Sequence, residues 1–269
     1  MILLIGYLIF AFSFSAHELG HAFAMRRYNV PIARISLFGF GPKLFTFRAR
    51  KFFGDTPISI CLIPLGAYVE PVFPHIDLLS TKQQGHIYGG GVIASILYTG
   101  ILMVIFSLIT PDVILLRAGL VSGILLLIGL FPRITWRIVP WIGFAILVLL
   151  LYMLYSSPAE FQKNNGSVVT IGQEMAKTAA AIPPTITFIE KLSRMLEFVI
   201  ALCLGVGVVQ ALPLIPLDGG RIVLAYLEKW FPNHWKLVEK IFTVITVIPF
   251  ILLVISALTG DLLRIINMF

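Results

Sequence analysis

Long apolar blocks constrain the fold of this chain more than any other feature of its sequence. Several blocks match or exceed the roughly 18 to 20 residues that a helix needs to cross the hydrocarbon core of a bilayer. Only 12% of the 269 residues are charged, whereas an ordinary soluble domain carries about 25%. The blocks also lack the short apolar–polar alternation of a transmembrane β-barrel. The sequence therefore predicts an α-helical polytopic membrane protein and excludes a soluble globular protein.

About six transmembrane helices are expected from these blocks. They cover residues 1–25, 87–109, 113–131, 138–155, 195–216 and 241–258. The segments between them include an insert at residues 26–85 and a loop at residues 156–194. We find no internal repeat and no room for a separate soluble domain, so we expect a single membrane-embedded domain over residues 1–269.

The basic residues predict the orientation of these helices. If residue 1 lies outside the cell, most of the 20 Lys and Arg residues fall on the inner side. The inner set is Arg26, Arg27, Arg34, Lys43, Arg48, Arg50, Lys51, Lys82, Arg133, Arg137, Arg221, Lys229, Lys236 and Lys240, and the outer set is Lys163, Lys177, Lys191, Arg194 and Arg264. The positive-inside rule then predicts a multi-pass protein of the cell membrane with an extracytoplasmic N-terminus.

The net charge of +7 is explained by this asymmetry, because the cations lie in loops rather than on one soluble basic face. No nucleic-acid partner is therefore expected, and the lipid bilayer is the expected surroundings.

The insert at residues 26–85 is predicted to fold as a small antiparallel sheet on the cytoplasmic side. Its candidate strands are residues 32–38, 43–50, 57–63 and 67–71. Each is short, rich in β-branched or aromatic residues, and bounded by Gly or Pro. The loop at residues 156–194 is expected on the extracytoplasmic side.

Three ionisable side chains interrupt the first apolar helix. His17, Glu18 and His21 stand among Leu, Phe and Ala residues, where a charged group costs about 2.5 to 3.5 kcal/mol on insertion scales. Because positions i and i+4 share one helix face, both imidazoles can reach one metal ion. This His-Glu-x-x-His spacing is that of zinc hydrolases, in which the Glu serves as general base. The alternative is that the three residues only bond neighbouring helices.

A third metal ligand is expected in another span, since catalytic zinc usually has three protein ligands. Asp218 follows two helix-breaking residues, Pro213 and Pro216, and irregular backbone at membrane depth is tolerated where it lines a polar cavity. Asp218 is therefore the candidate. Alternatively, it only caps the helix that starts near Arg221.

These two motifs together resemble the site-2 protease family of intramembrane zinc metalloproteases. His-Glu-Leu-Gly-His lies at residues 17–21 and Leu-Asp-Gly at 217–219, and Pro213 keeps the phase of the family's second motif, Asn-x-x-Pro-x-x-x-x-Asp-Gly. The insert is similar to the bacterial branch in Phe-Gly-Phe-Gly-Pro at 38–42 and Pro-Leu-Gly-Ala-Tyr-Val at 64–69. The chain resembles the members of that branch without a PDZ domain.

The resemblance implies a catalytic centre. It implies that His17, His21 and Asp218 bind one Zn²⁺ ion per chain, near the cytoplasmic side, and that Glu18 activates the attacking water.

The resemblance also implies where the substrate binds. A substrate helix must be unwound before hydrolysis, and a strand edge supplies backbone partners for the extended chain. The implied residues are Gly66, Ala67, Tyr68 and Val69. Gln210 stands where the family has the Asn of its second motif, and it offers the same amide on a longer arm for substrate binding.

Small residues in the second span are expected to serve packing alone. Gly90 with Ala94, and Gly91 with Ser95, are spaced to let helices approach closely. We assign them no catalytic part.

The predicted function is that of an intramembrane zinc metalloendopeptidase that cleaves transmembrane segments in regulated intramembrane proteolysis. The resemblance implies substrates such as anti-sigma factors, membrane-tethered regulators or remnant signal peptides. The alternative is a non-proteolytic membrane protein that binds or transports a divalent metal. A transporter would more naturally place ionisable groups in several spans, often with internal repeats.

Overall fold

The fold is described from a computed structural model, which describes residues 2–63, 66–72, 76, 78–109, 145, 148 and 188–266. The predicted spans at 113–131 and 138–155 lie outside the described residues, apart from positions 145 and 148, as do residues 156–187 of the predicted outer loop. The helices are α1 (Ile2–Arg27), α2 (Arg50–Phe53), α3 (Thr81–Ile109), α8 (Phe188–Gln210), α9 (Asp218–Trp230), the 3₁₀ helix η1 (Pro232–His234) and α10 (Trp235–Ile266). The strands are β1 (Ile32–Leu37), β2 (Phe40–Phe47), β3 (Ile58–Ile63) and β4 (Tyr68–Pro71).

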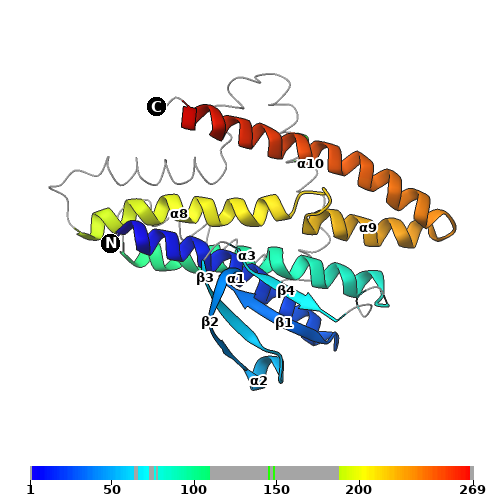
Figure 1. Cartoon of the computed structure of the whole chain (residues 1–269), viewed down its shortest axis with the longest axis horizontal. Helices are drawn as coiled ribbons and strands as arrows, with labels where there is room; N and C mark the ends of the chain where they lie inside the picture. Colours follow the sequence, from blue (N-terminus) through cyan, green and yellow to red (C-terminus); the bar gives the residue numbers. More distant parts are fainter. Residues whose placement is uncertain are drawn as a thin grey trace.

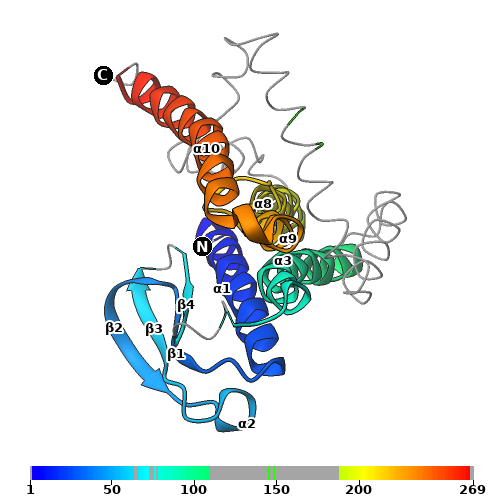
Figure 2. The same cartoon turned by 90° about the vertical axis from the view of Figure 1, so that its right-hand side faces the viewer.

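Three long helices form the body of the structure. Helices α1, α3 and α8 pack side by side, and α9 follows in line with α8 and packs on α3 (Figure 1). The sheet lies against α1 on the side away from α3 and α8 (Figure 2). Within the described residues, the segments Leu3–Arg27 and Thr81–Phe106 are long and apolar enough to cross a membrane.

The contact between α1 and α3 depends on two glycines. A Cβ atom on Gly20 would lie 2.2 Å from the Gly90 carbonyl oxygen and 2.5 Å from Ala94 Cβ. A Cβ atom on Gly90 would lie 2.7 Å from the Gly20 carbonyl oxygen. The predicted small-residue packing of Gly90 and Ala94 is therefore confirmed, because the two backbones meet directly.

Helices α8 and α10 begin and end at other residues than the predicted fifth and sixth spans. Helix α8 begins at Phe188, within the stretch predicted as an outer loop, and it ends at Gln210 rather than at residue 216. The turn that follows Gln210 contains Pro213, which lacks the N–H that a continuing helix would need. Helix α10 is likewise longer than the predicted span at 241–258 and runs from Trp235 to Ile266.

All four predicted strands are present, but the sheet is not antiparallel as predicted. The strand order is β2-β3-β1-β4, with β1 and β3 parallel and the other two pairs antiparallel. Strand β3 lies between β1 and β2, and its side chains Ile58 and Cys61 are buried. Strand β2 is exposed along most of its length and lies at one edge. Strand β4 forms the other edge, beside α1.

The sheet is anchored to α1 by a small apolar cluster. Ile35 and Ile58 of the sheet pack with Ala22 of α1 and with Phe53 of α2. Farther along α1, Phe38 contacts Phe12, with 4.9 Å between the ring centroids. The turn after β1 therefore reaches past His17 toward the N-terminal end of α1.

Candidate metal and active site

The two histidines of the first motif lie together on one face of α1. Both are buried, their rings are nearly perpendicular at 83°, and their Nε2 atoms are 3.2 Å apart. The i, i+4 spacing thus places two imidazole nitrogens at one point, as predicted.

Helix α3 orients both rings. His21 Nδ1 lies 2.7 Å from the Ile87 carbonyl oxygen, which can only accept, so Nδ1 carries the proton and donates it. His17 Nδ1 lies 2.9 Å from Ser95 Oγ. In a neutral His21 the lone pair is then on Nε2, which is the arrangement found in metal-binding histidines with a second hydrogen-bond partner.

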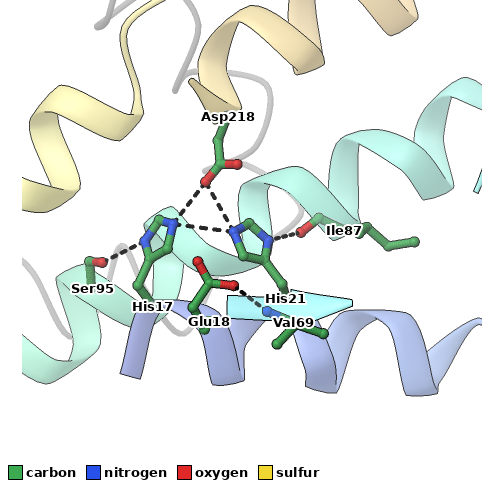
Figure 3. Close-up of polar contacts among 7 residues, drawn as sticks. All are labelled: His17, Glu18, His21, Val69, Ile87, Ser95 and Asp218. Atoms are coloured by element: carbon green, nitrogen blue, oxygen red, sulfur yellow. Dashed lines mark hydrogen bonds and ion pairs between the residues drawn. The ribbon is translucent and has the colours of Figure 1, made fainter. Parts of the chain in front are cut away.

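Asp218 completes the group from a distant part of the chain. It is the first residue of α9, and its Oδ2 atom lies 3.0 Å from His17 Nε2 and 3.1 Å from His21 Nε2 (Figure 3). The alternative in which Asp218 is the cap of a helix that starts near Arg221 is not found, because Leu217 is the N-cap residue and Asp218 already belongs to the helix.

Glycines at the start of α9 allow Asp218 to reach this position. A Cβ atom on Gly219 would lie 2.1 Å from the Ala211 carbonyl oxygen, and one on Gly220 would lie 2.5 Å from the Leu214 carbonyl oxygen. The chain between α8 and α9 therefore folds back directly on the first turn of α9. This close approach holds the Asp218 carboxylate over the two imidazoles.

The atoms His17 Nε2, His21 Nε2 and Asp218 Oδ2 are better placed to bind one metal ion than to form hydrogen bonds with one another. Within the described residues, the buried Asp218 Oδ2 atom has no hydrogen-bond donor, and an unprotonated His21 Nε2 offers it none. Tetrahedral zinc with bonds of about 2.0 to 2.1 Å separates its ligands by roughly 3.3 Å. The observed separations of 3.0, 3.1 and 3.2 Å are close to that value. With His17 Nδ1 donating to Ser95 Oγ, the Nε2 atom of His17 is also unprotonated, and a cation would satisfy all three acceptors.

Gly91 and Ser95 contribute to the site, which corrects the expectation that they serve packing alone. A Cβ atom on Gly91 would lie 2.3 Å from His21 Nε2 and 2.7 Å from His17 Cε1, so only glycine leaves room for the rings. Ser95 is buried and contacts His17 Nδ1. The signal available in the sequence was a polar Ser four residues after Gly91 on one face of an apolar helix.

Glu18 lies beside the two histidines but faces the sheet. Its Oε2 atom accepts a hydrogen bond from the Val69 N–H of β4 at 3.0 Å. The ligand-type atoms of His17, Glu18 and His21 all lie within 4.8 Å of one another. The carboxylate is thus close enough to exchange a proton with a water held by the histidine group.

The residues predicted to bind substrate lie on two sides of this group. Tyr68 and Val69 belong to β4, and Gly66 and Ala67 precede that strand. Gln210 is the last residue of α8. Across the described residues, no hydrogen bond joins Gln210 to the histidines, Glu18 or Asp218.

Comparison with known proteins identifies the family. The model of peptidase family M50 matches residues 5–256, which covers nearly the whole chain and both motifs. A search of curated proteins finds no match. The His17, Glu18 and His21 group is the His-Glu-x-x-His site of a metallopeptidase, in a family embedded in the membrane. The chain therefore belongs to peptidase family M50, the site-2 protease family, and is a membrane zinc metallopeptidase.

Proposed function

We propose that this protein is an intramembrane zinc metalloendopeptidase that hydrolyses peptide bonds within transmembrane segments of other membrane proteins. The observation that carries the proposal is the convergence of His17, His21 and Asp218 at 3.0 to 3.2 Å, with both histidines on α1, a helix of membrane-spanning length. Under this proposal the whole chain is one membrane-embedded domain. Its N-terminus is extracytoplasmic and its site is near the cytoplasmic side.

The roles of the residues follow from the chemistry of the group. His17, His21 and Asp218 would hold one Zn²⁺ ion per chain. Zinc in such a site supplies a Lewis acid and lowers the pKa of bound water to about 7. Glu18 takes the proton of the attacking water on its free carboxylate oxygen and passes it to the leaving amine.

The edge strand β4 is the proposed place of the substrate. A peptide in a transmembrane helix keeps its carbonyl groups in hydrogen bonds, so an attacked bond must first be unwound. At the edge formed by Gly66, Ala67, Tyr68 and Val69, the backbone groups that point outward and are not already bonded can pair with an extended segment, and Gln210 offers an amide from the side of α8. Single-span proteins such as anti-sigma factors, membrane-tethered regulators and remnant signal peptides are the proposed substrates.

A metal transporter is less well supported by the described residues. Their metal-ligating side chains form a single group, whereas transport needs polar groups along a path across the bilayer. Simple metal binding also gives no role to Glu18, whose carboxylate is bonded to the sheet.

The Glu18→Gln variant tests the proposal. Purified in detergent, it should retain one zinc per chain by elemental analysis and lose cleavage of a membrane-protein substrate by about 1,000-fold or more, since the amide cannot accept the proton. The His17→Ala variant is the matched control and should lose both zinc and cleavage. Unchanged cleavage by Glu18→Gln would contradict the proposed mechanism. Zinc flux into proteoliposomes that survives Glu18→Gln would favour the transporter.

The same Glu18→Gln protein offers a route to the substrate. Because it retains the binding surface but does not turn over, membrane proteins that co-purify with it and not with His17→Ala are candidates for the physiological substrate.

A further inference from the structure

One hydrogen bond joins the edge strand β4 to the Glu18 carboxylate. The Val69 N–H donates to Glu18 Oε2 at 3.0 Å (Figure 3). It connects residues 51 positions apart in the sequence. Figure 3 shows the other carboxylate oxygen on the side of His17.

The strand register explains why the Val69 amide is available for this bond. Val69 is paired with Ile35, and the Ile35 N–H donates to the Pro57 carbonyl oxygen on the other side of β1 at 3.0 Å. In an antiparallel ladder, residues that do not exchange hydrogen bonds point their backbone groups outward. The amide of Val69 therefore points to the open edge of the sheet, where Glu18 lies.

The Glu18 carboxylate needs a fixed hydrogen-bond partner to hold one orientation beside the histidines. It is only half-buried, and a Glu side chain has several rotatable bonds whose freedom opposes a single geometry. Neighbouring His17 and His21 are both held by α3 through their Nδ1 atoms. The Val69 amide is the corresponding partner of Glu18, and it is contributed by the sheet.

We propose that the main-chain amide of Val69 is a positioning group for Glu18, which couples the edge strand to proton transfer. By holding Oε2, this amide leaves the second carboxylate oxygen free for the proton of the attacking water. The inference rests on the proposed peptidase function and adds a specific role for one backbone group.

A consequence concerns the substrate strand. Because Glu18 occupies the Val69 N–H, that amide is not free to pair with an added strand. Continuing the alternation one residue beyond the start of β4 at Tyr68, the next amide facing the same edge is that of Ala67. Substrate pairing along this edge therefore stops before Val69, which leaves the following substrate peptide beside Glu18.

Replacement of the backbone amide by an ester tests the positioning role without changing a side chain. An ester at position 69, introduced with α-hydroxyisovaleric acid, replaces the N–H by an oxygen and also weakens the Tyr68 carbonyl as an acceptor, a side effect that the matched ester at Ala67 shares at its own preceding carbonyl. We expect kcat to fall about 10- to 100-fold, as for a lost hydrogen bond to a charged group, with KM changed less than about twofold and zinc content unchanged. The matched ester at Ala67 should instead raise KM, because it removes a substrate contact.

The same cleavage assay distinguishes a failure of the positioning role from a failure of the proposed peptidase function. If the wild type cleaves membrane substrates and the ester at position 69 keeps the wild-type kcat, or changes only KM as at Ala67, the positioning role is wrong and the peptidase function stands. If the wild type cleaves no membrane substrate, the proposed function itself is wrong.

Amide hydrogen exchange in the metal-free protein gives a readout that does not depend on activity. In protein labelled with ¹⁵N-valine, Glu18→Ala should speed exchange of the Val69 amide by about tenfold or more. The Ile35 amide, whose bond to Pro57 joins β1 to the residue just before β3, should exchange at the wild-type rate in ¹⁵N-isoleucine-labelled protein. Equal Val69 exchange in wild type and Glu18→Ala would overturn the inference even if the ester variants proved unstable.

Discussion

Space at the metal site is set by a single residue, Gly91. The rings of His17 and His21 occupy the volume where any side chain at this position would begin. Both rings are fixed from behind by Ser95 and the Ile87 carbonyl oxygen, so they cannot rotate away without losing a hydrogen bond. The glycine is therefore needed for the geometry of the ligands, in addition to helix packing.

Substitution of Gly91 tests this reasoning at the scale of one methyl group. Gly91→Ala should weaken zinc binding by about 1 to 3 kcal/mol, the usual cost of overpacking, which is roughly a 5- to 150-fold change in dissociation constant. Competition titration with a zinc-binding dye measures it. Gly205→Ala is the matched control, because a Cβ atom there would meet nothing within 4 Å. Equal zinc affinity in Gly91→Ala and wild type would contradict the prediction.

At the scale of elements, the site exists because three segments meet over α1. Helix α3 approaches through Gly20 and Gly90, α9 brings Asp218 after the turn that follows α8, and β4 brings Val69. The sheet contributes to the site as the helices do, through the hydrogen bond from Val69 to Glu18. Its edge strand β4 pairs with β1 on the side opposite β3 and lies against α1, where it reaches Glu18.

The contact between α1 and α3 should dominate the stability of this arrangement. Gly20→Ala places a Cβ atom 2.2 Å from the backbone oxygen of Gly90, so the helices must separate. We expect the free energy of unfolding in detergent to fall by about 1 to 3 kcal/mol, with weaker zinc retention because His17 and His21 lose their partners on α3. Denaturant titration followed by tryptophan fluorescence checks this. A Gly20→Ala protein as stable as Gly205→Ala would argue against direct backbone packing.

On the scale of the whole molecule, the arrangement of charge predicts how the protein sits in its membrane. The segment around Lys51 belongs to the sheet insert, and Lys163 belongs to the predicted outer loop. The two native cysteines, Cys61 and Cys203, are buried and leave the surface free for reporter cysteines.

Cysteine labelling in intact cells tests the orientation. A membrane-impermeant maleimide should label Lys163→Cys in intact cells and should label Lys51→Cys only after permeabilisation, because the predicted topology puts the insert inside. The native protein without added cysteine is the background control. The reverse pattern would invert the topology and move the site to the opposite side of the membrane.

The sequence by itself determined the features that depend on neighbouring residues. Apolar length predicted the helices at α1 and α3, short β-branched runs predicted four strands, and the i, i+4 spacing of His17 and His21 predicted that their nitrogens converge. Irregular backbone beside Asp218 singled out the carboxylate that the structure places 3.0 Å from His17 Nε2. These properties are local, because helix and strand periods fix which neighbouring side chains share a face.

Only the tertiary structure decided which distant groups support the site. The bond between His17 and Ser95 joins residues 78 positions apart, and that between Glu18 and Val69 joins residues 51 apart. No local pattern distinguishes β3 from β2 as the partner of β1, so the sheet was predicted antiparallel and is mixed. Strand order and ring orientation depend on burial between segments, and that burial exists only once the helices and the sheet have packed together.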